Sequence, residues 1–257
     1  MKLLRFILIL FVAGSFAGCS VNEKIEIKKN GGGSYSMDMD VSQMIDMMQQ
    51  IMSKEDMAKK GMSKMDTTIY MKDILDSANG LPADKKALFK DGTVHLKMDI
   101  DAKAAVIHVN FPFSSQENLQ KLFAGTTDGS LSMAELFKNL GGGSAAGSGL
   151  TQGMPNSDIN QFNSIYDFTC HDGLISKRVN DARWKAFQND PQTAQIKQFS
   201  SMGVSVTYTT TIVLPRPVKK IDNALVKLSD DKKTVTITFN LFDAIDHPEQ
   251  YGYTIAY

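Results

Sequence analysis

The sequence predicts an α+β fold in which antiparallel β-hairpins form a sheet and helices pack on one face of it. Two kinds of segment lead to this prediction. Short runs that alternate apolar and polar residues recur along the 257-residue chain, and several are separated by turns rich in glycine or aspartate. Other runs repeat apolar residues every three or four positions, which is the spacing of an amphipathic helix. The length allows one large domain or two small ones.

The first alternating runs predict a β-hairpin. Residues Glu23–Lys29 and Tyr35–Val41 alternate, and Asn30–Ser34 between them contains consecutive glycines. Glycine readily adopts the backbone conformations that tight turns need. The two runs are therefore expected to pair as antiparallel strands.

Two helical stretches are predicted to follow this hairpin. The range Met44–Met65 carries a stripe of apolar residues at helical spacing. The stripe consists of Met44, Met47, Met48, Ile51 and Met52. The range Asp66–Lys90 is also predicted to be helical, with a break near Gly80-Leu-Pro82.

A second hairpin is predicted from the alternating ranges Val94–Ile100 and Ala105–Phe111. If Asp101-Ala102 is its turn, His95 lies directly opposite His108 and the apolar residues stay on one face of the sheet. A register shifted by two residues also keeps the faces but separates the two histidines.

The middle of the chain contains helix starts and a linker. Ser114–Glu117 and Ser132–Glu135 are capping boxes, in which a serine and a glutamate satisfy backbone N–H groups at the start of a helix. Gly141–Gly149 contains only glycine, serine and alanine, which is the composition of a flexible linker.

The second part of the chain repeats the order of the first. A hairpin is predicted over Ser164–Val179 around Asp172-Gly173, and a helical range over Asp181–Met202 restarts at Asp190-Pro191. The remaining predicted elements are strands at Val204–Leu214, Ala224–Leu228, Thr234–Phe239 and Tyr253–Tyr257, and a short helix at Leu241–Asp246.

This recurring order leaves two arrangements open. One is a tandem of two related α+β halves, and the other is a single sheet with the helices on one face. The expected regions are an α+β region with the Met-rich helix at 19–140, a linker at 141–152 and an α+β region at 153–257.

Residues 1–18 have the order of a secretory signal peptide. A basic start at Met1–Arg5 is followed by the apolar run Phe6–Val12 and by small residues before Cys19. The apolar run is shorter than the about 20 residues that span a bilayer. Ala17-Gly18-Cys19 resembles the cleavage motif of bacterial lipoproteins, and plain secretion is the alternative.

The resemblance to bacterial lipoproteins implies a location. Cys19 would be lipidated, with acyl chains such as palmitate, and would become the new N-terminus after residues 1–18 are removed. Stable attachment of this kind needs more than one acyl chain, which lipoproteins have. Ser20 resembles the residue that follows the cysteine in lipoproteins released to the outer membrane. We therefore expect an envelope protein on the periplasmic face of the outer membrane.

Charge and hydropathy give no sign of nucleic-acid binding or of a membrane-spanning helix after the leader. The chain has 28 basic and 28 acidic side chains, and loss of Lys2 and Arg5 with the leader would leave it slightly acidic. This balance gives no reason to expect a nucleic-acid partner. No apolar run after the leader reaches the length of a membrane-spanning helix, so the lipid would be the only anchor.

The C-terminal part resembles a second pattern. Tyr208–Val218 is a strand-like run that ends in Leu-Pro-Arg-Pro-Val, Asn223 follows, and Leu228–Phe239 reads as a charged turn and a closing strand. This order is similar to that of LppM-type envelope lipoproteins. The resemblance implies an α+β module that binds lipid-like ligands, and it implies no catalytic residues.

Methionines are concentrated near the N-terminus, where ten of the fifteen lie within residues 37–71. Met44, Met47, Met48 and Met52 could fill a core or form a surface for a lipid or a partner protein, because thioether side chains adapt to irregular apolar surfaces. Alternatively, Met44 and Met47 could bind Cu(I), a soft ion that accepts thioether ligands.

The histidines and Cys170 are the remaining candidate site residues. His95 and His108 are a second metal hypothesis, although solvated strand histidines are more common. Cys170 is expected to be a buried structural thiol, because Cys19 would carry lipid and no other cysteine is left for a disulfide. His247 is expected to be solvated.

The sequence contains no P-loop, dinucleotide-binding motif, zinc-ligand spacing or nucleophile elbow. It therefore predicts a non-enzymatic envelope lipoprotein without a cofactor, which binds an apolar, lipid-like ligand or an envelope protein. The alternatives are copper binding through the Met-rich segment and an envelope hydrolase whose site forms only in the fold.

Overall fold

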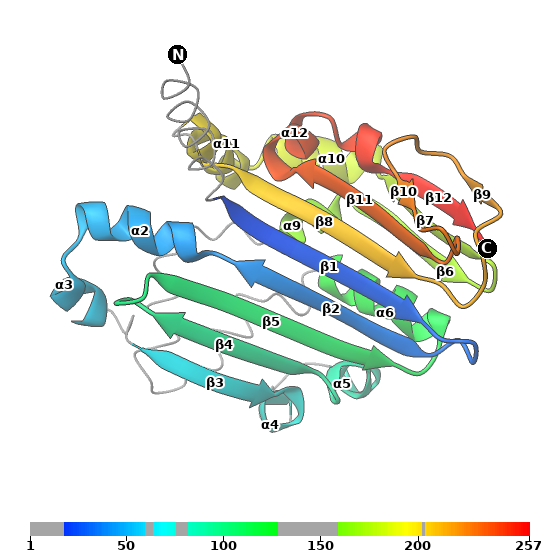
Figure 1. Cartoon of the computed structure of the whole chain (residues 1–257), viewed down its shortest axis with the longest axis horizontal. Coiled ribbons are helices and arrows are strands. Elements are labelled where there is room, and N and C mark those ends of the chain that lie inside the picture. Colours follow the sequence, from blue (N-terminus) through cyan, green and yellow to red (C-terminus); the bar gives the residue numbers. More distant parts are fainter. Residues whose placement is uncertain (1–17, 60–63, 76–81, 128–158, 202–203) are drawn as a thin grey trace, which may run out of the picture.

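The computed structural model describes residues 18–59, 64–75, 82–127, 159–201 and 204–257, and these form two β-sheets with helices (Figure 1). The large sheet has eight strands in the order β10-β11-β8-β1-β2-β5-β4-β3, and the small sheet has four in the order β6-β7-β12-β9. Neighbouring strands are antiparallel except β1 and β8, which are parallel. The predicted α+β class with antiparallel hairpins is confirmed.

The strand bounds follow the sequence order. The large sheet consists of β1 (Cys19–Ile27), β2 (Gly33–Asp40), β3 (Met65–Tyr70), β4 (Thr93–Asp99), β5 (Ala104–Phe113), β8 (Val206–Val213), β10 (Lys227–Leu228) and β11 (Thr234–Asn240). The small sheet consists of β6 (Tyr166–His171), β7 (Leu174–Val179), β9 (Lys220–Ile221) and β12 (Tyr253–Ala256).

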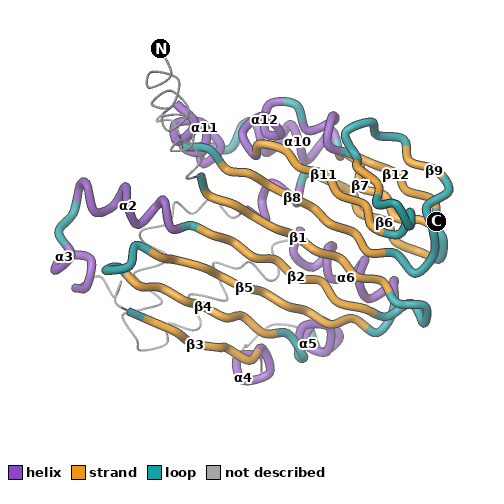
Figure 2. Tube along the Cα trace, in the orientation of Figure 1, coloured by secondary structure: helices purple, strands orange, loops and turns teal. Residues whose placement is uncertain are grey.

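The helices lie at the sheet ends and behind the large sheet (Figure 2). They are α2 (Ser42–Ile51), α3 (Lys54–Lys59), α4 (Met71–Leu75), α5 (Ala83–Phe89), α6 (Gln116–Thr127), α9 (Ile159–Ser164), α10 (Asp181–Gln188), α11 (Pro191–Ser201), α12 (Leu241–Asp246) and the 3₁₀ helix η1 (Pro248–Tyr251). No helix in the described ranges has both the length and the apolar composition needed to cross a bilayer.

The main core lies between the large sheet and the layer formed by α6, α9 and the small sheet. Ile25 of β1, Leu119 of α6, Ile175 of β7 and Ile255 of β12 are all fully buried in this one core. We call the face of the large sheet toward this core the inner face. No described helix packs on the opposite, outer face (Figure 1).

Alternation along each strand separates the two faces. In β1, Val21 and Ile25 are buried on the inner face. Asn22 and Lys24, which lie between them in the sequence, point to the other face and are exposed. Burial of the apolar row on one side is what holds the register, because a slip of one residue would turn that row to solvent.

The predicted helix over Met44–Met65 is wrong in its extent. Helix α2 ends at Ile51, α3 covers only Lys54–Lys59, and Met65 already begins strand β3. The predicted helix over Asp66–Lys90 is also wrong at its start, because residues 66–70 belong to strand β3. The β-branched Thr67, Thr68 and Ile69 have low helix propensity and instead pair with β4 at the edge of the large sheet.

The predicted histidine hairpin is confirmed. Strands β4 and β5 pair in the register that places His95 opposite His108, and the pairing ends at Asp99 and Ala104. The turn therefore has four residues rather than two. Its last residue, Lys103, has a positive φ of 53°, which lets the chain reverse.

The two predicted α+β regions share the large sheet. Strand β1 from the first region lies directly beside β8 from the second, and the two exchange backbone hydrogen bonds over their whole length. The large sheet therefore contains strands from both predicted regions. The capping box at 132–135 and the linker at 141–152 lie outside the described residues.

Most local predictions in the second region are confirmed. Strands β6 and β7 flank a two-residue turn at Asp172-Gly173, where Gly173 has a φ of 80°. Helix α11 begins at Pro191 and α12 spans Leu241–Asp246. The strand predicted at Ala224–Leu228 shortens to Lys227–Leu228, because only these residues pair with β11.

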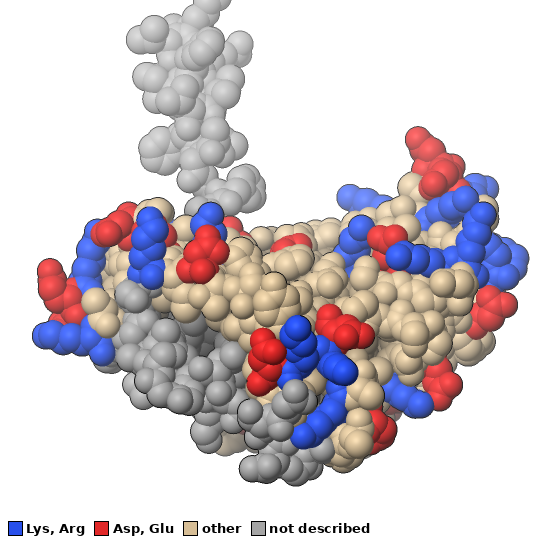
Figure 3. Space-filling view, turned by 90° about the horizontal axis from the view of Figure 1, so that it is seen from below, with Lys and Arg blue, Asp and Glu red and all other residues tan. Residues whose placement is uncertain are grey.

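Charges of both signs are mixed on the side of the molecule that carries β3 and α4 (Figure 3). Pairs such as Lys54 with Asp101 and Lys64 with Asp99 join lysines to carboxylates there and along the neighbouring edge. Among the described residues, this side shows no extended surface of one sign.

Candidate functional site

Cys19 is the first residue of β1, and its side chain is buried between the sheet and α2. Its Sγ lies 4.0 Å from Oε1 of Gln43, near the start of α2. Since Cys19 already pairs with Val206 of β8, no flexible segment separates it from the folded body. Any lipid on this cysteine would hold the end of the large sheet close to the membrane.

The methionine stripe contributes to a small second core. Met57 is completely buried there with Ile45 and Met98, and Met48 and Met52 pack partly against it. Met47 is half-buried, and the side chain of Met44 lies outside those described. Core packing thus accounts for Met48 and Met52. No group of three or more His, Cys, Asp or Glu side chains in the described ranges is placed to hold a metal ion.

Cys170 is a buried structural thiol, as predicted. It is 3% exposed and forms no disulfide, and burial raises the pKa of its thiol to about 12. A thiol with such a pKa is almost entirely protonated at neutral pH and is a poor nucleophile. The neighbouring His171 is exposed. His247 is also exposed, beside Glu249, as predicted.

A cavity between α6, α9 and the β6–β7 hairpin brings together residues that were not predicted to form a site. Its volume is about 110 Å³. It is lined by Gln120, Phe123 and Ala124 of α6, Asn163 of α9, Tyr166, Asp167 and Phe168 of β6, Lys177 of β7 and Arg183 of α10.

Lys177 supplies the buried charge of this cavity. Its side chain is only 5% exposed, and Nζ donates a hydrogen bond of 2.8 Å to Oδ1 of Asn163. Nζ also lies 4.6 Å from the centre of the Tyr166 ring, within the range of a cation–π interaction. Burial lowers the pKa of Lys177, and the negative charge of Glu23 partly opposes this.

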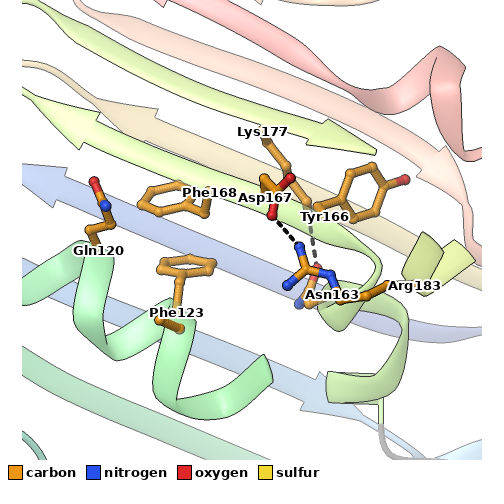
Figure 4. Close-up of a pocket in the computed structure, with 9 residues that line it drawn as sticks. Gln120, Phe123, Asn163, Tyr166, Asp167, Phe168, Lys177 and Arg183 are labelled. Carbon is orange, nitrogen blue, oxygen red and sulfur yellow. Dashed lines mark hydrogen bonds and ion pairs between the residues drawn. The ribbon is translucent and has the colours of Figure 1, made fainter. Parts of the chain in front are cut away.

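Aromatic rings line the cavity beside Lys177 (Figure 4). The rings of Phe123 and Phe168 stack with their centres 4.0 Å apart and their planes 15° apart. Phe168 pairs with Lys177 across the β6–β7 hairpin, so the register of one hairpin places an aromatic ring and an ammonium group side by side.

The solvent side of the cavity carries a charge pair. The guanidinium of Arg183 donates a hydrogen bond to Asp167, which also accepts one of 3.2 Å from Nδ2 of Asn180. Asn180 caps α10 by accepting a hydrogen bond from the backbone N–H of Arg183. The buried Nε of Arg183 has no hydrogen-bond partner.

A chain of buried hydrogen bonds connects Lys177 to the large sheet. Asn163 accepts from Lys177 and donates through Nδ2 to the hydroxyl of Tyr208, at 3.1 Å. Beside Tyr208, the 2% exposed carboxylate of Glu23 accepts hydrogen bonds from Thr210 at 2.8 Å and Tyr35 at 3.3 Å. Burial first, and then the charge of Glu23, raise the pKa of Tyr208 well above its usual value.

The sequence did carry a signal for this site. Alternation places Glu23 in the apolar row of β1 with Val21 and Ile25, and it places Lys177 in the row of β7 that contains Ile175. A charged residue within an apolar row predicts a buried charge, which is rare without a partner. Which partners surround it depends on the packing of the two sheets.

Comparison with known proteins finds no match, either to a protein-family model, to a curated protein or to a solved structure.

Proposed function

We propose that this chain is a non-enzymatic lipoprotein of the bacterial cell envelope, anchored by lipid on Cys19 at the periplasmic face of the outer membrane, and that it binds a small anionic ligand in the Lys177 cavity. The observation that carries the ligand proposal is the buried ammonium group of Lys177, because a buried charge is costly and has to be balanced by its surroundings.

The polar groups of the cavity favour an anion. An ammonium group has three donors, and one donor of Lys177 is used by Asn163. The unpartnered Nε of Arg183 adds a further donor. The carboxylate of Asp167 already accepts hydrogen bonds from Arg183 and Asn180. The cavity therefore offers a ligand more hydrogen-bond donors than acceptors.

The size of the cavity limits the ligand. At about 110 Å³ it is smaller than the roughly 300–1,000 Å³ of typical ligand pockets. A whole lipid does not fit, but a short carboxylate does, or the anionic end of a longer molecule. The stacked rings of Phe123 and Phe168 supply an apolar wall for the hydrocarbon part of such a ligand.

The lining residues favour binding over catalysis. Within the described part of the chain they include no serine, threonine, cysteine or histidine, and the one carboxylate among them, Asp167, is paired with Arg183. A nucleophile with an adjacent base is the minimum for hydrolytic acyl transfer. A hydrolase is therefore the weaker proposal.

The ligand proposal is tested by calorimetric titration of the detergent-extracted full chain with butyrate, benzoate and inorganic phosphate. We expect a carboxylate to bind, and Lys177→Met to weaken binding by about tenfold or more, since a hydrogen bond to a charged group contributes about 1.5–3 kcal/mol. Lys24→Met, on the exposed outer face, is the matched control and should bind normally. Equal affinity of wild type and Lys177→Met for all three compounds would overturn the proposal.

The anchor proposal is tested separately by mass spectrometry of the N-terminal peptide from membranes of the native host. A triacylated peptide beginning at Cys19 is expected, and Cys19→Ser should move the protein to the soluble fraction. An unmodified Cys19 in membrane-bound protein would refute the anchor without affecting the ligand proposal.

A further inference from the structure

His95 and His108 lie directly opposite each other on adjacent strands β4 and β5, on the outer face of the large sheet. Their side chains are 39% and 42% exposed, so both rings are open to solvent. Directly opposed residues of an antiparallel pair have Cβ atoms about 4.5–5.5 Å apart. One ion above the sheet is therefore within reach of both imidazoles.

Each histidine has a carboxylate partner on the strand that flanks the pair. Nε2 of His95 shares a hydrogen bond of 2.7 Å with Asp66 of β3, and Nδ1 of His108 shares one with Asp38 of β2. The two aspartates thus lie on the outer sides of the histidine pair. Metal-binding histidines commonly donate their second ring nitrogen to a carboxylate, which fixes the ring and makes the ligating nitrogen more basic.

The two nitrogens of an imidazole point to opposite sides of the ring. A carboxylate that holds one nitrogen on the flanking side therefore turns the other nitrogen away from that side. In this arrangement the remaining nitrogens are Nδ1 of His95 and Nε2 of His108, and each can act as an acceptor toward a metal ion once its partner nitrogen carries the proton.

We propose that His95 and His108 together bind one divalent transition-metal ion of the Zn²⁺, Ni²⁺ or Cu²⁺ class, with Asp66 and Asp38 orienting the rings. Imidazole ligands suit these ions, whereas Ca²⁺ and Mg²⁺ prefer oxygen ligands. Water fills the remaining coordination positions, because no third His, Cys, Asp or Glu ligand joins the pair within the described ranges.

This site is independent of the Lys177 cavity, which lies on the other face of the large sheet. Two protein ligands define an open site with exchangeable positions rather than a closed structural one. The nearby Lys97, whose charge acts on Asp66, reduces the attraction for a cation and favours modest affinity. The site is thus suited to reversible metal binding at the sheet surface.

The test is a titration of the full chain with ZnCl₂, NiCl₂ and CuCl₂, followed by calorimetry and by NMR signals of the histidine rings. One equivalent of metal should shift the signals of His95 and His108 together. Either His95→Ala or His108→Ala should weaken binding at least tenfold, and the double variant should be little weaker than either single one, because a chelate fails when one ligand is lost.

Asp66→Asn and Asp38→Asn test the orienting role and should weaken binding by about 10–100-fold without abolishing it. His171→Ala and His247→Ala remove exposed histidines elsewhere and are the matched controls. Binding that survives His95→Ala, or that falls equally in the control variants, would overturn the proposal. Because all four histidines are solvent-accessible, thermal unfolding should verify that each variant folds like wild type.

Discussion

The two faces of the large sheet carry charged residues under opposite conditions. On the outer face, Lys24 of β1 is exposed, and its Nζ lies 3.4 Å from the carboxylate of Glu26. One residue earlier on the same strand, Glu23 points into the core, is 2% exposed and depends on two hydroxyl groups. The comparison shows that alternation alone decides whether a charge in this sheet is inexpensive or must be enclosed by partners.

The same contrast separates the two proposed sites. The histidine pair uses exposed side chains that need no packing partner, so its cost to the fold is small. The Lys177 cavity uses a buried ammonium, which stabilises a fold poorly even when paired. The two proposed sites thus differ in what they cost the fold.

The largest expected effect comes from exchanging one residue on each face of β1. Ile25→Ala should lower the free energy of unfolding by about 2–5 kcal/mol, because it removes a fully buried side chain and leaves a cavity. Lys24→Ala should change it by no more than about 0.5 kcal/mol. Urea denaturation measures both. Similar losses of unfolding free energy in the two variants would contradict the exposure of the outer face.

A second pair compares single hydrogen bonds on the two faces of β8. Tyr208→Phe should cost about 1–3 kcal/mol, because the buried amide of Asn163 loses its acceptor. Thr209→Val removes an exposed hydrogen bond to Thr238 and should cost at most about 0.5 kcal/mol. Urea denaturation measures both losses. A larger loss of stability in Thr209→Val than in Tyr208→Phe would contradict the expected difference between the two faces.

At pH 7, Lys177→Met should change the free energy of unfolding by no more than about 1–3 kcal/mol. The removal of a buried charge is offset by the loss of the donor to Oδ1 of Asn163. Burial lowers the pKa of Lys177 in the fold below its usual 10.5, so the unfolded chain binds more protons between these two values. Wild-type stability should therefore gain from this group as pH rises through that window.

Buried tyrosines act in the opposite direction. The pKa values of Tyr208 and Tyr253 are raised by burial, so ionisation favours the unfolded chain above about pH 10. Wild type and Lys177→Met both lose stability through these tyrosines. The difference between their free energies of unfolding therefore reports the contribution of Lys177 alone. Urea denaturation from pH 7 to 10 measures it. A difference that does not change with pH would refute the assignment.

The smallest expected effect on stability is that of Asp66→Asn. The hydrogen bond to His95 lowers the pKa of Asp66, so its contribution is present above the usual value of 3.8 and is lost as pH falls through the lowered pKa. The group is exposed and screened by solvent, and thermal unfolding at pH 7 should hardly change. Metal affinity should fall all the same, which would separate a ligand-orienting role from a structural one.

Local patterns were enough to predict the hairpins and the opposed positions of His95 and His108. Alternation and turn residues predicted the pairing of β1 with β2, of β4 with β5 and of β6 with β7, and the apolar row set the register that places His95 opposite His108. Helix boundaries were less predictable. Thr67–Ile69 became a strand because the edge of β4 offered backbone partners that no local pattern reveals.

What the sequence determined by itself is therefore local: the turns, the alternation and the lipoprotein-like residues that end at Cys19. Only the tertiary structure decided that β1 lies beside β8 and that Asn163 links Lys177 to Tyr208. These contacts join residues far apart in the chain, and they depend on how two sheets and a helix fill one core. A charge in an apolar row can be recognised from the sequence, but its partners are chosen by packing.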